Sequence, residues 1–266
     1  MNDQDKTPKK TSRKLLPGLR VGEGFTRHPF DLEFGVRTSG LVAGRDLKSG
    51  HANDRHNTAY YGVAPSVLRE MLVRWRRVKP PLPLDAYTFV DVGAGMGRAV
   101  LVASAYRFRA VVGVELHPTL AAIARRNITA WRKAQRAHAP IKMLCRDAVE
   151  YGLPDGPCLL FLFNPFGPPV LKRLLNQWAN SLKGREHQVD LLYVNHEHAL
   201  TIRQQAGWTR LFSGEVQRSR ADAVADHRIL ANQPEGEYAV TNWEDCSIFR
   251  WTGSGKVQEK AHKIQK

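Results

Sequence analysis

The sequence has few cysteines and lacks long hydrophobic runs. Its three cysteines, Cys145, Cys158 and Cys246, stand far apart and show neither metal-binding nor redox spacing. No stretch approaches the roughly 20 uncharged apolar residues that a membrane span requires, and the polar N-terminus does not resemble a signal peptide. We therefore predict a cytoplasmic protein without a membrane segment, because isolated cysteines fit a reducing compartment.

Acidic residues are also scarce, with 25 Asp and Glu against 40 Lys and Arg, which gives a net charge of +15. Much of this excess lies at the two ends, and we predict that residues 1–25 and 253–266 are basic disordered tails. Such tails are typical of proteins with an anionic partner, such as nucleic acid or an acidic protein surface. They equally occur as solvated tails that aid solubility.

Between the tails we predict a single domain over residues 63–252, preceded by an irregular N-terminal extension over residues 26–62 that packs on it. Short apolar runs alternate with helical segments in the domain, which predicts a doubly wound α/β sheet. A closing antiparallel pair makes the sheet mixed. We expect the polar stretch 217–243 to be a loop insertion. The predicted strands cover residues 88–92, 110–116, 141–146, 158–163, 189–194, 208–216 and 246–251.

A glycine-rich loop joins the first predicted strand to a helix, in the sequence Asp91-Val92-Gly93-Ala94-Gly95-Met96-Gly97. Glycine lets the backbone turn sharply and approach a ligand without an intervening Cβ. The N-terminus of the following helix presents free N–H groups. This strand–turn–helix arrangement predicts a nucleotide-cofactor site.

Two features of the loop distinguish between possible cofactors. A dinucleotide fingerprint requires a small residue at the third position of Gly-x-Gly-x-x-Gly/Ala, where this chain has Arg98. We expect Arg98 on the helix surface. Asp91, two residues before the loop, repels a pyrophosphate but suits a cationic cofactor. The loop therefore favours S-adenosylmethionine over NAD.

Acids at the ends of the next two strands extend this site. Glu115 ends the second strand and can bind both ribose hydroxyls, as it can for either cofactor. Asp147 follows the third strand and is placed to accept a hydrogen bond from the adenine amino group, with Ala148 offering its backbone N–H. Asp147 can alternatively serve as a helix cap. We expect cofactor contacts from Asp91, Gly93, Ala94, Gly95, Gly97, Glu115, Asp147 and Ala148.

Together, the glycine-rich loop and the acids at the ends of the next two strands resemble the motifs of the class I, or seven-stranded, S-adenosylmethionine-dependent methyltransferases. The segments FVDVGAGMGRA (89–99), VVGVELHP (111–118) and CRDA (145–148) are similar to that family's cofactor motifs in order. Two further segments, TAYYGVAPSVL (58–68) and LFLFNPFGPPV (160–170), resemble bacterial members of undefined substrate and, more distantly, the non-SET protein-lysine methyltransferases. The resemblance implies a Rossmann-like sheet of seven strands.

The candidate catalytic residues follow the fourth strand, at the edge where a substrate arrives. The Asn164 side-chain carbonyl can accept an N–H from an amine and aim its lone pair, Pro165 keeps the backbone extended, and Phe166 can face a base or a cation. The family resemblance adds Tyr61, in a segment that folds over the cofactor and substrate. Because the order Asn-Pro-Phe departs from the Asn/Asp-Pro-Pro-aromatic motif of nucleic-acid amino methyltransferases, it favours another amine.

Asn195-His196-Glu197-His198 follows the fifth strand at the same edge. The metalloprotease pattern needs histidines four apart, so we expect no metal here, and the segment either lines a substrate pocket or begins a helix. We predict a methyltransferase that acts on a protein lysine. Alternatives are a nucleic-acid base methyltransferase, a non-catalytic cofactor-binding domain with a protein or nucleic-acid partner, and an NAD-dependent oxidoreductase.

Overall fold

The computed structural model describes Leu16, Leu19 and residues 26–231 and 240–253. The predicted basic tails therefore lie almost entirely outside the described residues. Within the described part, none of the helices combines the length and the apolar character needed to cross a membrane.

The described chain folds into helices and strands in the order expected for a doubly wound domain. The strands are β1 (Leu41–Val42), β2 (Tyr60–Tyr61), β3 (Thr88–Val92), β4 (Ala110–Glu115), β5 (Ile141–Cys145), β6 (Cys158–Phe163), β7 (Val189–Val194), β8 (Trp208–Gln217) and β9 (Trp243–Trp251). The α-helices are α1 (Pro29–Phe34), α2 (Pro65–Arg77), α3 (Arg98–Ser104), α4 (Pro118–Lys133), α5 (Pro168–Ser181), α6 (Ala199–Arg203) and α7 (Arg220–Ala231). Short 3-10 turns are η1 (Gly44–Asp46), η2 (Asp54–His56), η3 (Leu84–Ala86) and η4 (Ala148–Glu150).

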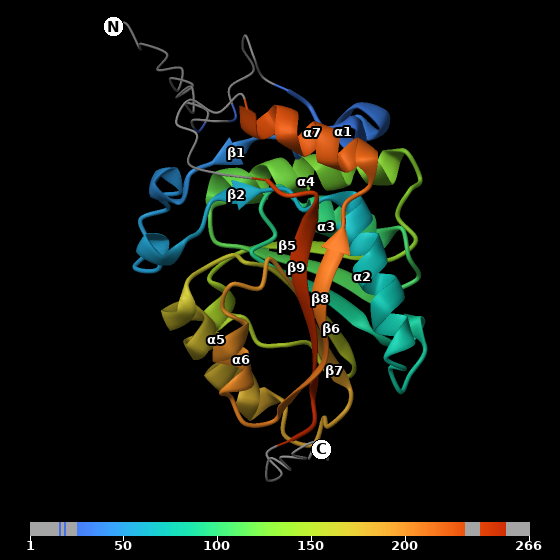
Figure 1. Cartoon of the computed structure of the whole chain (residues 1–266), viewed down its shortest axis with the longest axis vertical. Coiled ribbons are helices and arrows are strands. Elements are labelled where there is room, and N and C mark those ends of the chain that lie inside the picture. Colours follow the sequence, from blue (N-terminus) through green and yellow to red (C-terminus); the bar gives the residue numbers. More distant parts are fainter. Residues whose placement is uncertain (1–15, 17–18, 20–25, 232–239, 254–266) are drawn as a thin grey trace, which may run out of the picture.

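Seven strands form one mixed sheet in the order β5-β4-β3-β6-β7-β9-β8 (Figure 1). The strands β3 to β7 pair in parallel, whereas β9 pairs antiparallel with both β7 and β8. The predicted fold class is therefore confirmed, including the closing antiparallel pair. In this order β3 lies between β4 and β6. The chain continues from β3 to β4 and β5 on one side of it, and then crosses to β6 and β7 on the other side. Ligands of doubly wound sheets bind at such a switch point.

Helices cover both faces of the sheet because the central strands are apolar on both sides. In β3, Phe89 packs into the cluster formed with α2, α3 and α4, while Val90 and Val92 pack into the cluster under α5 and α6. This alternation follows the two-residue period of a strand. Asp91 shares its period with Phe89 and is also buried. The sheet therefore holds a carboxyl group on the α3 side, beside the glycine loop.

We predicted a loop insertion over residues 217–243, but this prediction was wrong for Arg220–Ala231, which form the helix α7. This helix lies beside α1 of the N-terminal extension, at the top of Figure 1. Its inward face carries Asp222 and Asp226, and His28 reaches them with Nε2–Oδ1 distances of 3.5 and 3.8 Å. Hydrophobic periodicity misses this helix because acids occupy the face that it buries.

Candidate functional site

The glycine loop after β3 has a backbone that other residues adopt rarely. Gly93 and Gly95 have φ angles of +79° and +53°, in the left-handed region. A Cβ added at Gly95 lies 2.2 Å from Tyr60 Cε2, and one added at Gly93 lies 2.3 Å from Pro165 Cβ. The glycines therefore provide the backbone turn and also let the Tyr60 ring and Pro165 approach the loop.

Glu115 at the end of β4 accepts hydrogen bonds from two backbone groups, one of which is in this loop. Its Oε2 accepts from the Gly95 N–H at 2.8 Å, and its Oε1 accepts from the His117 N–H at 2.7 Å. Burial raises the pKa of Glu115, although the backbone N–H groups bound to it act in the opposite direction. Each carboxylate oxygen has two lone pairs, so one on each oxygen stays available for a ligand hydroxyl.

Asp91 is a second buried carboxyl group next to the loop. Burial, followed by the neighbouring Glu115, raises the pKa of Asp91 to about 8. No ion pair joins Asp91 or Glu115 to a basic side chain in the part of the chain that the structure describes. These two acids therefore form an electrostatically unfavourable pair, which a cation bound nearby relieves.

Asp147 follows β5 and caps the turn η4, since its Oδ1 accepts from the Val149 N–H at 2.9 Å. Its Oδ2 accepts from the Asn53 side-chain amide at 2.7 Å. The helix-cap role that the sequence left open is thus present, together with a bond to the N-terminal extension. Asn53 offers Asp147 the same N–H chemistry as an adenine amino group.

The strand ends and the N-terminal extension line a cavity of about 80 Å³, which we call the first cavity. It brings together most of the predicted cofactor and catalytic residues, namely Gly93, Gly95, Glu115, Asp147, Ala148, Tyr61, Pro165 and Phe166. The remaining predicted residues, Asp91, Ala94, Gly97 and Asn164, are not among those that line it.

Asn164 instead lines a neighbouring, more open cavity, which we call the second cavity. Its φ of +40° is left-handed, a conformation that asparagine tolerates better than most residues. The Tyr193 hydroxyl donates to Asn164 Oδ1 at 3.0 Å and so restricts rotation of the side-chain amide. The backbone carbonyl of Asn164 accepts from the Thr58 hydroxyl.

The segment 56–61 of the N-terminal extension separates the two cavities. It pairs antiparallel with the strand-to-helix turn, through Thr58 N–H to the Pro165 carbonyl at 3.3 Å and Gly167 N–H to the His56 carbonyl at 2.9 Å. Five residues line both cavities and form the wall between them: Asn57, Thr58, Ala59, Tyr61 and Phe163. The wall thus places Tyr61 at the boundary between the two cavities.

Tyr61 is held by a residue that the sequence did not single out. Its hydroxyl donates to Asp226 Oδ1 of α7. Arg218 then pairs with Asp226, with an Nε–Oδ2 distance of 3.3 Å, and also with Glu244. Burial and the nearby Asp226 raise the pKa of Tyr61 well above its ordinary value. Tyr61 therefore stays protonated, and its proton is committed to Asp226.

Arg98 is not on the helix surface as we expected, because the N-terminal extension covers it. Its side chain is 2% exposed, and it donates to the Thr38 hydroxyl at 2.7 Å and to the Gly62 carbonyl at 2.9 Å. The guanidinium group thus fastens the extension to the start of α3. The sequence held no periodic signal for this contact, since Thr38 and Gly62 lie in irregular segments.

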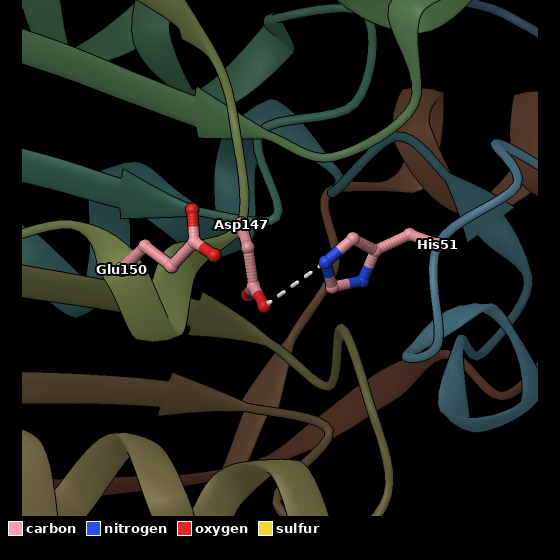
Figure 2. A group of neighbouring side chains, drawn as sticks. All are labelled: His51, Asp147 and Glu150. Atoms are coloured by element: carbon pink, nitrogen blue, oxygen red, sulfur yellow. Dashed lines mark ion pairs between the residues drawn. The ribbon is translucent and has the colours of Figure 1, made fainter.

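His51, Asp147 and Glu150 form one group whose ligand atoms lie within 4.8 Å of one another. Figure 2 shows His51 reaching Asp147 from a separate segment, with an Nε2–Oδ2 distance of 3.8 Å. Both oxygens of Asp147 already accept hydrogen bonds, from Asn53 and Val149. Glu150 is exposed. These three residues therefore do not make a closed ligand set of the kind that structural metal sites use.

No protein-family model and no curated protein matches the sequence. Solved structures resemble the chain at low identity. Magnesium protoporphyrin IX methyltransferase from Synechocystis, with bound S-adenosylmethionine, is 12% identical, and the match covers 71% of this chain and 79% of that one, with a TM-score of 0.45. An RNA methyltransferase from Salinibacter ruber, in complex with S-adenosylhomocysteine, is 17% identical over 73% and 94% of the two chains, with a TM-score of 0.40.

A ribosomal protein L11 methylase from Lactobacillus delbrueckii subsp. bulgaricus is 12% identical, covering 70% of this chain and 77% of that one, with a TM-score of 0.40. The three structures come from methyltransferases with different substrates, a porphyrin, an RNA and a protein. Likenesses at this identity concern the fold alone.

Proposed function

We propose that this chain transfers the methyl group of S-adenosylmethionine to a nitrogen atom, with a protein lysine as the acceptor. The observation that supports this most is the pair of buried carboxyl groups at the glycine loop. Asp91 and Glu115 have raised pKa values and no basic partner among the described residues. In a chain with a net charge of +15, such a pair favours a cationic ligand.

The residues of the first cavity fit this cofactor. Glu115 keeps a lone pair on each oxygen for the ribose hydroxyls, beyond the bonds from Gly95 and His117. Asp147 Oδ2 can accept a hydrogen bond from the adenine amino group when that group replaces the Asn53 side-chain amide as its donor. Asp91 attracts the ammonium group through the loop or a water molecule. The full proposed contact set is Asp91, Gly93, Ala94, Gly95, Gly97, Glu115, Asp147 and Ala148.

A dinucleotide fits the same residues poorly. Arg98 stands where the dinucleotide fingerprint requires a small residue, and its guanidinium group is turned into the N-terminal extension, where it binds Thr38 and Gly62. It therefore offers no charge to a pyrophosphate. Asp91 and Glu115 are carboxyl groups and offer a pyrophosphate no positive charge either. These contacts favour S-adenosylmethionine over NAD for this chain.

The cofactor supplies an activated methyl group, and the chain has to position the acceptor and exclude water. We propose that Asn164, Pro165, Phe166 and Tyr61 do this. The Asn164 carbonyl oxygen accepts an N–H of the acceptor amine, with the side chain steadied by Tyr193. Phe166 packs at the first cavity, and Pro165 fixes the turn against the segment 56–61. Tyr61 offers its oxygen at the wall between the cavities.

An RNA base is the second candidate acceptor, and the net charge of +15 is the observation that favours it. The order Asn164-Pro165-Phe166 speaks against it, since the amino methyltransferases of nucleic acids carry a different motif at this turn. Incubation of the full chain with tritiated S-adenosylmethionine and a cell lysate separates these candidates. We expect protease treatment to release the label and nuclease treatment to leave it. Label released by nuclease alone contradicts the lysine proposal.

A further inference from the structure

The second cavity lies beside the cofactor pocket and has a different chemical character. Five residues form the shared wall, so an acceptor bound in the second cavity meets the cofactor across one layer of side chains. Methyl transfer needs the reacting atoms about 3–3.5 Å apart and in line. An amine in the second cavity therefore reaches the methyl group only where these wall side chains move apart.

Acidic side chains outnumber basic ones around the second cavity. Glu197, Glu244 and Asp245 line it together with Arg45 and Arg218. Arg218 is engaged by Glu244 and by Asp226 behind the wall. Glu197 and Asp245 are exposed and form no ion pair with a basic side chain among the residues described. Against the single charge of Arg45, these two carboxylates leave the rim with an excess of one negative charge.

The inner part of the second cavity presents hydrogen-bond acceptors. Because a carboxylate can only accept, Tyr61 donates its single proton to Asp226, and its phenolic oxygen keeps its lone pairs for another donor. Asn164 contributes its side-chain oxygen nearby. Phe163 and Trp243 line the same cavity and supply aromatic surface for an alkyl chain or a cation.

We propose that the second cavity binds the methyl acceptor as an alkylammonium side chain, with Glu197 and Asp245 attracting its charge at the rim as it enters and Tyr61 and Asn164 receiving the amine N–H groups at the wall. This inference rests on the proposed function and assigns residues to its acceptor. In the transfer the amine loses a proton to solvent, and its lone pair forms the N–C bond. The S–C bond breaks at the same time, with its electron pair staying on sulfur.

A nucleic-acid acceptor fits this rim poorly. A base brought to the wall carries its phosphates toward Glu197 and Asp245, where like charges repel. A lysine side chain has an apolar stem, which matches the aromatic surface, and one terminal charge, which the acids attract as it enters. The second cavity thus selects the positive acceptor, although the chain as a whole is basic.

Calorimetric titration of the full chain with S-adenosylhomocysteine and its derivatives tests the inference. In the derivatives, nitrogen replaces sulfur and carries an arm of two to five carbons that ends in an ammonium, a methyl or a carboxylate group. We expect the best ammonium arm to bind about tenfold more tightly than the matching methyl arm. The double variant Glu197→Gln, Asp245→Asn should reduce that gain to below about threefold. S-adenosylhomocysteine itself should bind both proteins equally, which shows that the variant is folded.

Asp85→Asn is the matched control, because Asp85 is an exposed acid that precedes β3 at the opposite edge of the sheet. It should keep the full gain from the ammonium arm. Equal binding of the ammonium and methyl arms, tighter binding of the carboxylate arm, or a gain that survives the double variant overturns the inference but leaves the proposed function intact. Absence of S-adenosylhomocysteine binding to the unaltered chain overturns the proposed function, and the inference with it.

Discussion

The two cavities differ in how the chain builds them. The first cavity takes its predicted cofactor residues from the carboxyl ends of β3, β4 and β5, which are neighbours in the sheet. The second takes residues from the carboxyl ends of β6 and β7 and adds residues from the extension, α7 and the segments beside β8 and β9, which are distant in sequence. A site made of strand ends follows from the sheet alone. A site made of added segments depends on long-range polar contacts such as Tyr61 with Asp226.

The largest expected effect falls on the first cavity. Gly95→Arg should weaken S-adenosylhomocysteine binding by more than about 100-fold, because the residue has a left-handed φ and its Cβ meets the Tyr60 ring. Gly50→Arg is the control, since Gly50 has a φ of +86° and open space around its Cβ position. Calorimetry should show near-normal affinity for the control. Normal affinity in Gly95→Arg contradicts the assigned place of the cofactor.

The second expected effect falls on the second cavity and on stability. Arg218→Ala should lower the free energy of unfolding by about 3–5 kcal/mol, because it leaves Asp226 and Glu244 buried without their partner. Urea denaturation measures this loss. Glu70→Ala removes a half-buried pair on one helix, with an Nε–Oε1 distance of 2.9 Å to Arg74, and should cost only about 0.3–0.5 kcal/mol. If the two variants lose similar free energy of unfolding, the ion pairs of Arg218 with Asp226 and Glu244 do not stabilise the wall between the cavities.

Glu115→Gln tests the acid that links the glycine loop to β4. The amide keeps the shape but removes the charge and one acceptor oxygen, so S-adenosylhomocysteine affinity should fall by about 10- to 100-fold. Asp155→Asn, an exposed acid in the loop before β6, should bind as the unaltered chain does. If Glu115→Gln retains full affinity, the ribose hydroxyls bind elsewhere.

The smallest expected effect is a dependence on pH. The folded Asp91 carboxyl has a pKa of about 8, above its ordinary 3.8. It therefore holds a proton that the unfolded chain releases, and its contribution to stability falls as pH rises from about 4 to about 8. A cationic cofactor favours the ionised form, so its affinity should rise about fivefold between pH 7 and pH 8. The affinity of Asp91→Asn for the cofactor should not change between pH 7 and pH 8. If this variant shows the same rise, a group other than Asp91 causes the pH dependence.

The same contrast explains what could be predicted from the sequence. Apolar runs such as CLLFLF and the loop after Asp91 indicated the sheet and the cofactor residues, because both depend on local pattern. The burial of Arg98 and the helix over 220–231 escaped prediction. Arg98 is buried by Thr38 and Gly62, and α7 buries acids that pair with His28 and Arg218. Such polar contacts between distant segments leave no periodic trace in the sequence.

Separate titrations of the full chain with S-adenosylhomocysteine and with NADH test the central claim most directly. The account predicts saturable binding of S-adenosylhomocysteine with one site per chain, no binding of NADH, and loss of the first signal in Gly95→Arg. Binding of NADH in the first cavity, or no heat with S-adenosylhomocysteine, contradicts the claim that this loop is built for S-adenosylmethionine and not for a dinucleotide.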